Sequence, residues 1–207
     1  MILRVNATRM ELLKLRRRLE IARRGHKLLK DKQDELMRHF LALIEENRNL
    51  RQEVERKLMR AHSAFLMARA VMDRASLEAA LMFPKQRISI GVGTERVMNL
   101  QVPRLRLSSE GDVHAYGLIS TSGELDTALK LYSEVLPDMI RLAQMERALQ
   151  LLAEEIERTR RRVNALEYVL IPNLEDTIRY IRMRLDEMER SSTVRLMKIK
   201  EMLAGRR

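Results

Sequence analysis

Two long stretches of the sequence place apolar residues at alternating steps of three and four. The first stripe begins at Leu12 and continues to Ala75, and sixteen of its nineteen positions are apolar. The second begins at Leu142 and continues to Leu203, with sixteen of eighteen positions apolar. This spacing puts the apolar side chains on a single helix face and persists for about nine heptads, so it indicates coiled-coil seams.

The two stripes have nearly equal lengths, which indicates how they pair. They cover 64 and 62 residues, or roughly 95 Å of helix each at ~1.5 Å per residue. In an antiparallel hairpin within one chain each stripe buries the other, and facing residue numbers add up to about 216. A parallel homodimer would leave the second stripe without a partner. We therefore expect a mainly α fold, a long antiparallel two-helix coiled-coil hairpin.

Glycine and proline are concentrated between the two stripes. Seven of the eleven such residues fall between 84 and 123, which predicts a small β-hairpin-containing insert at the turn end of the coiled coil. The expected division is a first long helix within 1–83, the insert at 84–123 and a second long helix within 124–207.

The insert has the period-two pattern of β-strands. Ile88, Ile90 and Val92 alternate with small residues, and Leu100 alternates with Val102. Gly93-Thr94-Glu95 lies between these runs and is typical of a turn, so the sequence predicts a β-hairpin that turns there. A short third strand is expected near 116–119.

Two threonines predict where long helices begin. Thr8 precedes Glu11 by three residues, and Thr121 precedes Glu124 by the same spacing. In this capping-box pattern the hydroxyl accepts an N–H of the first turn. We expect one helix to start after Thr8 and another after Thr121.

Two prolines and one asparagine interrupt the helical pattern. Pro137 is expected to bend or restart the second helix, and Pro172 to kink it and free the carbonyl of Tyr168. Consecutive steps of four from Leu166 to Ile178 predict a local stutter. Asn47 would face position 169, where its amide would either donate to a freed carbonyl or fix the register of the coiled coil.

Composition removes several classes of protein. Of the 207 residues, 33% are charged, 3% are aromatic and none is cysteine. The lack of cysteine excludes disulfide and thiolate-metal frameworks and is typical of a reducing compartment. Uninterrupted apolar runs reach only about five residues, too short for a membrane span or a secretory signal. We expect a soluble, cytoplasmic chain.

Positive charge is concentrated at the two ends of the sequence. The net charge is +11, with ten Lys or Arg and two Glu in 1–30, and six basic residues and one Glu in 190–207. The predicted hairpin brings both ends to one basic tip, which should attract acidic surfaces or phosphate. These features leave open a nucleic-acid-binding coiled coil or a scaffold, although neither end carries an aromatic residue for base stacking.

Catalytic motifs are missing from the sequence. No glycine is followed by lysine, which excludes a Walker A loop, and no two of the four histidines are four residues apart. Neighbouring carboxylates such as Glu45 and Glu46 point in different directions on a helix. The sequence therefore predicts no catalytic residue, no cofactor and no metal site, and the chain is not an enzyme by itself.

Three segments resemble the D-subunit family of V-type (A/V-type) rotary ATPases and ATP synthases. They are VNATRMELL at 5–13, GHKLLKDKQDELM at 25–37 and TRRRVNALEYVLIPNLEDTI at 159–178, and the resemblance covers nearly the whole chain. The family typically has proline where this chain has Ala7. The resemblance implies a non-catalytic central-stalk axle, the rotor shaft of the complex. Such an axle transmits torque between a catalytic ring, which makes or hydrolyses ATP, and a membrane ring that translocates protons or sodium ions.

The resemblance also implies partners. They are the catalytic and non-catalytic ring subunits (A and B), a small F subunit of the stalk, and a funnel-shaped, membrane-proximal C subunit next to the β-containing insert. It implies a peripheral position on the cytoplasmic face of the membrane without insertion, and it argues against nucleic acid as a partner. We expect the F subunit around 40–70 and 130–165. The expected contacts with the ring are Arg4, Arg9, Arg16, Arg17, Arg18, Arg23, Arg24, Arg160, Arg161, Arg162, Lys198 and Lys200.

Overall fold

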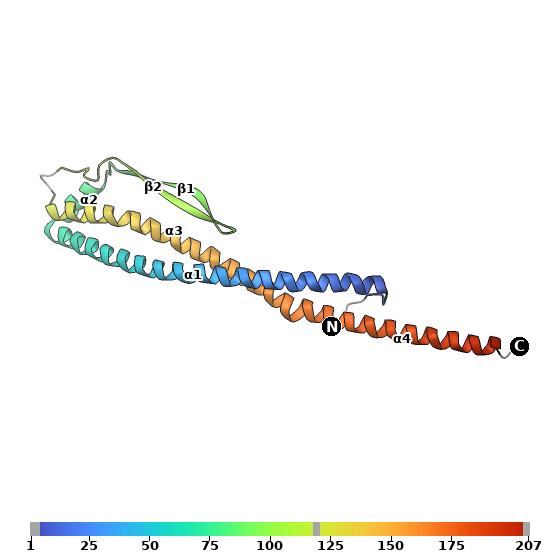
Figure 1. Cartoon of the computed structure of the whole chain (residues 1–207). Helices are drawn as coiled ribbons and strands as arrows, with labels where there is room; N and C mark the ends of the chain where they lie inside the picture. Colours follow the sequence, from blue (N-terminus) through green and yellow to red (C-terminus); the bar gives the residue numbers. More distant parts are fainter. Residues whose placement is uncertain (1–4, 118–120, 205–207) are drawn as a thin grey trace. The chain divides into compact units, whose positions relative to one another are not determined.

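The computed structural model describes residues 5–117 and 121–204, and it is mainly helical. Along the chain come α1 (Arg9–Val71), α2 (Arg74–Leu81), β1 (Arg87–Val97), β2 (Leu100–Glu110), α3 (Gly123–Ala165), a π-helical turn η1 (Leu166–Leu170) and α4 (Ile171–Ala204) (Figure 1). The long helices α1 and α3 pack together, and the two strands between them in the sequence form an antiparallel hairpin. The predicted fold class is confirmed.

α1 begins where the first capping pattern predicts. The Glu11 N–H lies 3.3 Å from Thr8 Oγ1, so the hydroxyl accepts one of the N–H groups that have no partner inside the helix. The helix starts at Arg9, directly after this cap.

The second capping pattern does not act as predicted. The Thr121 hydroxyl donates to the Gly117 carbonyl at 3.1 Å, and it is the Ser122 carbonyl that accepts the Leu125 N–H at 3.0 Å. α3 does start close by, at Gly123. The predicted cap by Thr121 is wrong because its hydroxyl is bonded to the preceding loop.

The first long helix ends earlier than its apolar stripe predicts. α1 stops at Val71, and Asp73 caps the separate helix α2, because its carboxylate accepts the Ala75 N–H at 3.3 Å. Leu77 of α2 is buried in a cluster that also contains residues of α1 and α3. Residues that were expected to extend the first long helix therefore form the separate short helix α2 instead.

Contacts divide the chain into two compact units. Unit 1 consists of residues 1–35 and 156–207, and unit 2 of residues 36–155. The core of unit 1 joins α1 to α4 through Leu15, Ala22, Leu174 and Ile181. In unit 2, Leu50, Val54, Val135 and Met145 form one core, and Ala68, Leu77 and Leu125 form another. Residues of the predicted stripes supply most of these cores, so the seams are confirmed in the parts of the helices where these cores lie.

The helices pair in an antiparallel register that differs from the prediction. In unit 1 Arg9 lies beside Glu189, and Arg23 lies beside Glu175. In unit 2 Arg51 contacts a glutamate of α3, Glu146. Facing residue numbers therefore add up to about 197 rather than about 216. The residues of α4 beyond Glu189 consequently have no described α1 residue opposite them.

Asn47 does not make the predicted hydrogen bond to a carbonyl freed near Pro172. Asn47 belongs to unit 2, whereas Pro172 belongs to unit 1. The Asn47 Nδ2 is buried and has no hydrogen-bond partner among the described residues. The prediction that it donates to a freed carbonyl is wrong, because no described carbonyl accepts a hydrogen bond from it.

The two prolines have different surroundings. Pro137 lies inside α3, which continues through it without a restart. Pro172 is the second residue of α4 and follows the π-helical turn, in which the Ile171 N–H donates to the Leu166 carbonyl five residues earlier. A π turn contains one residue more than an α turn. The irregularity expected near Pro172 is therefore this widened turn.

The β-hairpin is longer than predicted, with eleven residues in each strand. Its turn consists of Met98-Asn99, and Met98 has a φ of 55°, the left-handed region where glycine is the usual residue. The predicted turn at 93–95 is wrong, because these residues lie inside β1. Residues 118–120, which include half of the predicted third strand, lie outside the described residues, and no strand is assigned at Tyr116 or Gly117.

Candidate partner-binding surfaces

The net positive charge of the chain belongs entirely to unit 1. Residues 1–35 and 156–207 contain 24 Lys or Arg and 13 Asp or Glu, a net charge of +11, whereas residues 36–155 contain 16 of each kind. The potential around unit 1 is therefore positive, and unit 2 is balanced. An acidic partner would be attracted to unit 1.

Four of the predicted ring contacts form ion pairs within the chain. The pairs are Arg9–Glu189, Arg23–Glu175, Arg24–Glu20 and Arg161–Glu157. Arg23 lies 2.6 Å from its glutamate and joins α1 to α4. Seven of the eight side chains are largely exposed and Glu175 is partly exposed, and exposed pairs contribute only about 0–1 kcal/mol to stability. A partner can therefore exchange these contacts for its own at little cost.

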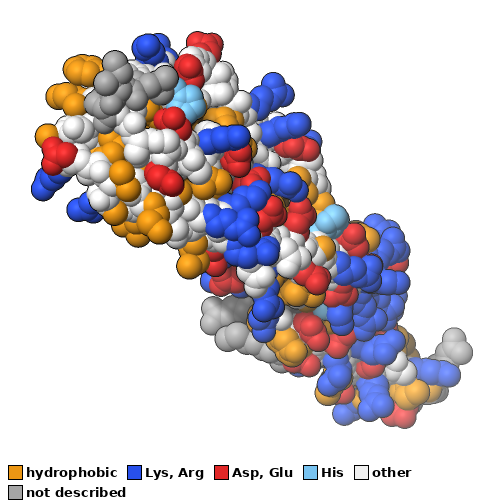
Figure 2. Space-filling view, turned by 90° about the vertical axis from the view of Figure 1, so that its left-hand side faces the viewer, with side chains coloured by type: hydrophobic (Ala, Val, Ile, Leu, Met, Phe, Trp, Pro, Cys, Tyr) orange, Lys and Arg blue, Asp and Glu red, His pale blue; other side chains and the backbone are white. Residues whose placement is uncertain are grey.

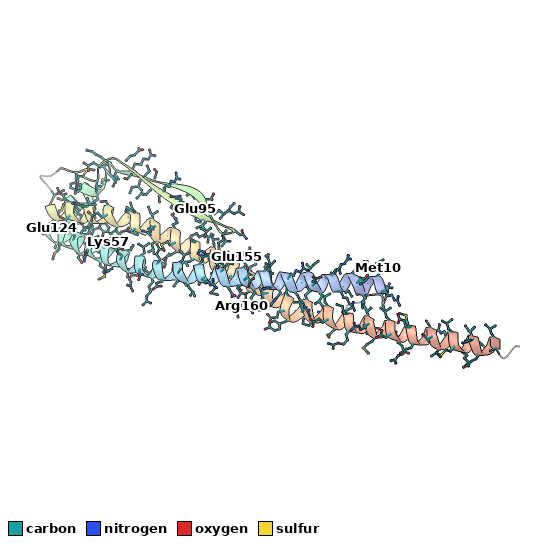
Figure 3. The ribbon with its side chains drawn as sticks, in the orientation of Figure 1. Met10, Lys57, Glu95, Glu124, Glu155 and Arg160 are labelled. Atoms are coloured by element: carbon teal, nitrogen blue, oxygen red, sulfur yellow. The ribbon has the colours of Figure 1, made fainter. Side chains whose placement is uncertain are left out.

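The other predicted contacts within residues 5–117 and 121–204 form no ion pair there. They are exposed and consist of Arg16, Arg17, Arg18, Arg160, Arg162, Lys198 and Lys200. Arg160, labelled in Figure 3, comes from the last part of α3. Arg4 lies outside the described residues. A carboxylate of a partner can therefore pair with these cations without first displacing a carboxylate of this chain.

The basic residues do not gather at a single tip. Because Arg9 lies beside Glu189, the α1 cations that follow it lie alongside the first part of α4 and the end of α3. Lys198 and Lys200 lie farther along α4, beyond the start of α1. The predicted common tip is wrong for the same reason as the predicted register.

The last part of α4, residues 190–204, is a basic helix that exposes several apolar side chains, and we name it the projecting segment. Its apolar residues are 48–67% exposed and consist of Val194, Leu196, Met197, Ile199, Met202 and Leu203. Leu196, Ile199 and Leu203 belong to the stripe that was expected to form a seam within the chain. Since no described residue covers this part of the stripe, it is available to a partner.

None of the helices in the described part of the chain combines the length and the apolar character that a membrane span needs.

Unit 1 also contains an open apolar groove beside the π turn. Its volume is about 560 Å³, and it is lined by Arg18, Ile21, Ala22, Gly25, Leu166, Leu170 and Leu174. Nothing lies within 4 Å of the place where a Cβ of Gly25 would be. This groove was not predicted from the sequence, although Gly25 and the steps of four after Leu166 mark its two sides.

In unit 2, α1 exposes a second apolar surface, which we name the outer face. It consists of Met59, Leu66, Met67 and Val71, which are 60–72% exposed. Helical spacing puts Met59 and Leu66 on the side opposite the seam residues, and Met67 and Val71 on the flank of the helix next to them. Figure 2 shows that hydrophobic side chains (orange) also lie open between charged ones on the molecular surface. Methionine adapts its shape to a partner, so the outer face suits a docking role.

Two polar contacts connect elements of unit 2. Lys57, labelled in Figure 3, lies 2.6 Å from Asp138 of α3 and 2.8 Å from Glu53, and the hydrogen bonds to these two carboxylates raise the pKa of Lys57. The Tyr116 hydroxyl donates to Asp126 at 2.5 Å. Burial, together with this hydrogen bond, raises the pKa of Tyr116. Neither contact puts a nucleophile next to a general base, so both are structural in character.

The sequence matches a known family over nearly its full length. The family model that describes the D subunit of ATP synthase matches residues 11–201. The D subunit of the V-type ATP synthase of Acetivibrio thermocellus is 60% identical over 206 residues, which cover 98% of this chain and 93% of that protein. The proteins of the same name from Thermoanaerobacter sp. and Clostridium botulinum are each 53% identical, over 98% and 99% of this chain and 98% of each relative. The chain therefore belongs to the D-subunit family of ATP synthases, the non-catalytic central-stalk subunit of the V-type complexes.

Proposed function

We propose that this chain is the rotor shaft of its V-type ATP synthase and transmits torque between the catalytic ring and the ion-translocating ring of the membrane. The family match over residues 11–201 carries the proposal. A shaft needs helices that are packed along their length and differ from face to face. The antiparallel cores of both units and the unequal distribution of charge between them support this role.

The ring of A and B subunits is the proposed partner of unit 1. The projecting segment offers apolar side chains together with Lys198 and Lys200, and α1 adds the unpaired Arg16, Arg17 and Arg18. Exposed charge contacts are weak and easily exchanged. That property suits a part that turns against its surroundings, whereas a strong bidentate pair would hold it in one position.

The outer face of α1 is the proposed binding site for the small F subunit. It falls largely within 40–70, one of the two ranges where we expect the F subunit, and it exposes Met59, Leu66 and Met67. The C subunit is proposed to contact the part of unit 2 that contains the β-hairpin. Through these contacts the chain would lie on the cytoplasmic side of the membrane without entering the bilayer.

The proposed ring contact can be tested with a variant of the projecting segment in the reconstituted complex. Replacing Leu196, Ile199 and Leu203 with serine should leave the folding of the isolated chain intact, because these side chains are exposed. It should weaken assembly with the ring of A and B subunits, or reduce the number of ions pumped per ATP hydrolysed. The matched control replaces the same residues with methionine, which keeps the apolar area. Normal assembly and coupling in the serine variant would rule out this contact.

A further inference from the structure

The β-hairpin of unit 2 has one covered edge and one open edge. The Leu105 N–H of β2 donates to the side-chain oxygen of Gln144 in α3 at 3.0 Å, so the free edge of β2 faces α3. β1 pairs with β2 alone, and none of its residues is buried. The other edge of β1 is therefore open within the described part of the chain (Figure 1).

The pairing identifies which backbone groups point outward from this edge. In a hairpin with a two-residue loop, the closing pair exchanges both hydrogen bonds, and the pattern then alternates along the strands. The closing pair here is Val97 and Leu100. The outward N–H and C=O groups of β1 therefore belong to Arg96 and to Ile88, Ile90, Val92 and Thr94.

Two observations on β2 agree with this assignment. Leu105 lies opposite Val92, so its N–H should also point away from the hairpin, and it does donate to α3. Pro103 lies opposite Thr94, where a residue needs no N–H for the pairing. The alternation is therefore consistent at both positions.

The outward residues also carry apolar side chains that the described chain leaves uncovered. Ile88, Ile90 and Val92 are 45%, 50% and 74% exposed. Proteins usually protect an open edge with a bulge, a proline or an inward-pointing charge. β1 contains no proline and pairs without a bulge over all eleven residues. A long, unprotected edge of this kind is the surface that strand addition uses.

The net positive charge of the hairpin favours an acidic added strand over a second copy of β1. β1 and β2 contain four Arg and two Glu. Glu95, labelled in Figure 3, lies 3.6 Å from Arg104, whereas no ion pair within the described residues involves Arg87, Arg96 or Arg106. A second copy of β1 would bring like charges together, which is unfavourable, but an acidic strand would pair with these arginines.

We propose that the open edge of β1 accepts an added β-strand from another subunit of the V-type ATP synthase, a strand with alternating apolar and acidic side chains. Its backbone hydrogen-bonds to the outward groups of β1, and its apolar side chains cover Ile88, Ile90 and Val92. Its carboxylates lie on the other face of the sheet and meet Arg87, because side chains alternate between the two faces of a strand. This mode of recognition rests on the proposed function, in which this part of unit 2 contacts a neighbouring subunit.

Amide hydrogen exchange tests this proposal, measured on the isolated chain and on the assembled complex. The N–H groups of Ile88, Ile90, Val92 and Thr94 should exchange at least about tenfold more slowly in the complex, because they gain hydrogen-bond partners. Those of Gly91 and Gly93 already donate to β2 and should change less. Equal exchange of the outward amides in both states would overturn the proposal. Protection that grows with the concentration of the isolated chain would also overturn it, since it would mean pairing between two copies.

A matched pair of variants separates backbone pairing from contact by side chains. Thr94→Pro removes an outward N–H without removing a bond to β2, whereas Thr94→Val keeps that N–H. In the complex, the proline variant should lose about tenfold of the protection at Val92, and the valine variant should keep it. Equal protection in both variants would overturn strand addition. Ion pumping is recorded on the same complex. Unchanged amide exchange together with normal pumping would contradict strand addition alone, whereas a loss of the shaft role would show in the pumping.

Discussion

Asn47 lies in the seam of unit 2 with its amide nitrogen buried and without a hydrogen-bond partner among the described residues. A buried donor left without a partner costs roughly 1–3 kcal/mol. Asn47→Leu should therefore raise the free energy of unfolding by about 1 kcal/mol in urea denaturation followed by circular dichroism. Asn49→Leu, at an exposed position, is the control and should stay within about 0.5 kcal/mol of the parent. A less stable Asn47→Leu would mean instead that the amide fixes the register.

The phenol of Tyr116 should ionise late in a titration. Its pKa is raised above the ordinary 10.0 by burial and by the hydrogen bond to Asp126. The folded state thus holds this proton more tightly than the unfolded chain, so the stability that the contact contributes is complete below about pH 10 and is lost as the pH rises through the folded-state value. The difference in tyrosinate absorbance between the parent and Tyr116→Phe isolates this group.

The titration of Tyr116 has a direct control in its partner. Asp126→Asn removes the negative charge that opposes ionisation of the phenol, and it should lower the Tyr116 midpoint toward 10.0. A midpoint that does not move in this variant would contradict the assignment of Asp126 as a cause.

At the scale of the elements, the apolar spacing was sufficient to predict the helices and their buried faces, because it reports a helix face directly. The steps of four from Leu166 to Ile178 also contained the signal of the π turn. An α turn contains about 3.6 residues, so apolar residues spaced by four drift around the helix and away from the partner helix. A π turn, with one additional residue, turns them back toward it. The hairpin turn was not predictable in the same way, since Met98-Asn99 contains no glycine although Met98 has a positive φ.

The length of α4 gives a prediction that separates the two registers. A chain that ends at Glu189 loses only residues that no part of α1 covers, and its melting temperature should stay within about 2 °C of the parent. A chain that ends at Tyr180 also loses the fully buried Ile181. It should be destabilised by about 2–5 kcal/mol and melt several degrees lower, as measured by circular dichroism. Equal destabilisation in both truncations would support the register predicted from equal seam lengths.

At the scale of the whole molecule, the register could not be predicted from the stripes. A heptad pattern still matches after one helix slides by a heptad, and the predicted and observed sums differ by close to three heptads. The position that decides the register is the end of α1 at Val71, where Asp73 caps a new helix. The sequence was sufficient to identify the basic residues near both ends of the chain. It did not predict how those of α1 and α4 are offset along the helices, because that offset depends on the register.

The separation of charge between the units predicts how association depends on salt. If the cations of unit 1 steer the chain into its ring, its association rate should fall by about tenfold or more between about 0.05 M and 0.3 M salt. Replacing Arg16, Arg17, Arg18, Lys198 and Lys200 with glutamine should slow association at low salt and flatten this dependence. The control replaces five exposed cations of unit 2 with glutamine, namely Arg48, Arg56, Arg60, Arg69 and Lys130.

Both five-residue variants lower the net charge of the chain from +11 to +6, so a comparison by stopped-flow fluorescence distinguishes local from overall charge. Screening limits the reach of an exposed charge to about 10 Å at 0.1 M salt. If the cations of unit 1 steer association, the association rate of the unit 1 variant should lose most of its salt dependence, whereas that of the unit 2 variant should keep it. Equal losses in the two variants would mean that the total charge, and not the position of the cations on α1 and α4, accelerates association.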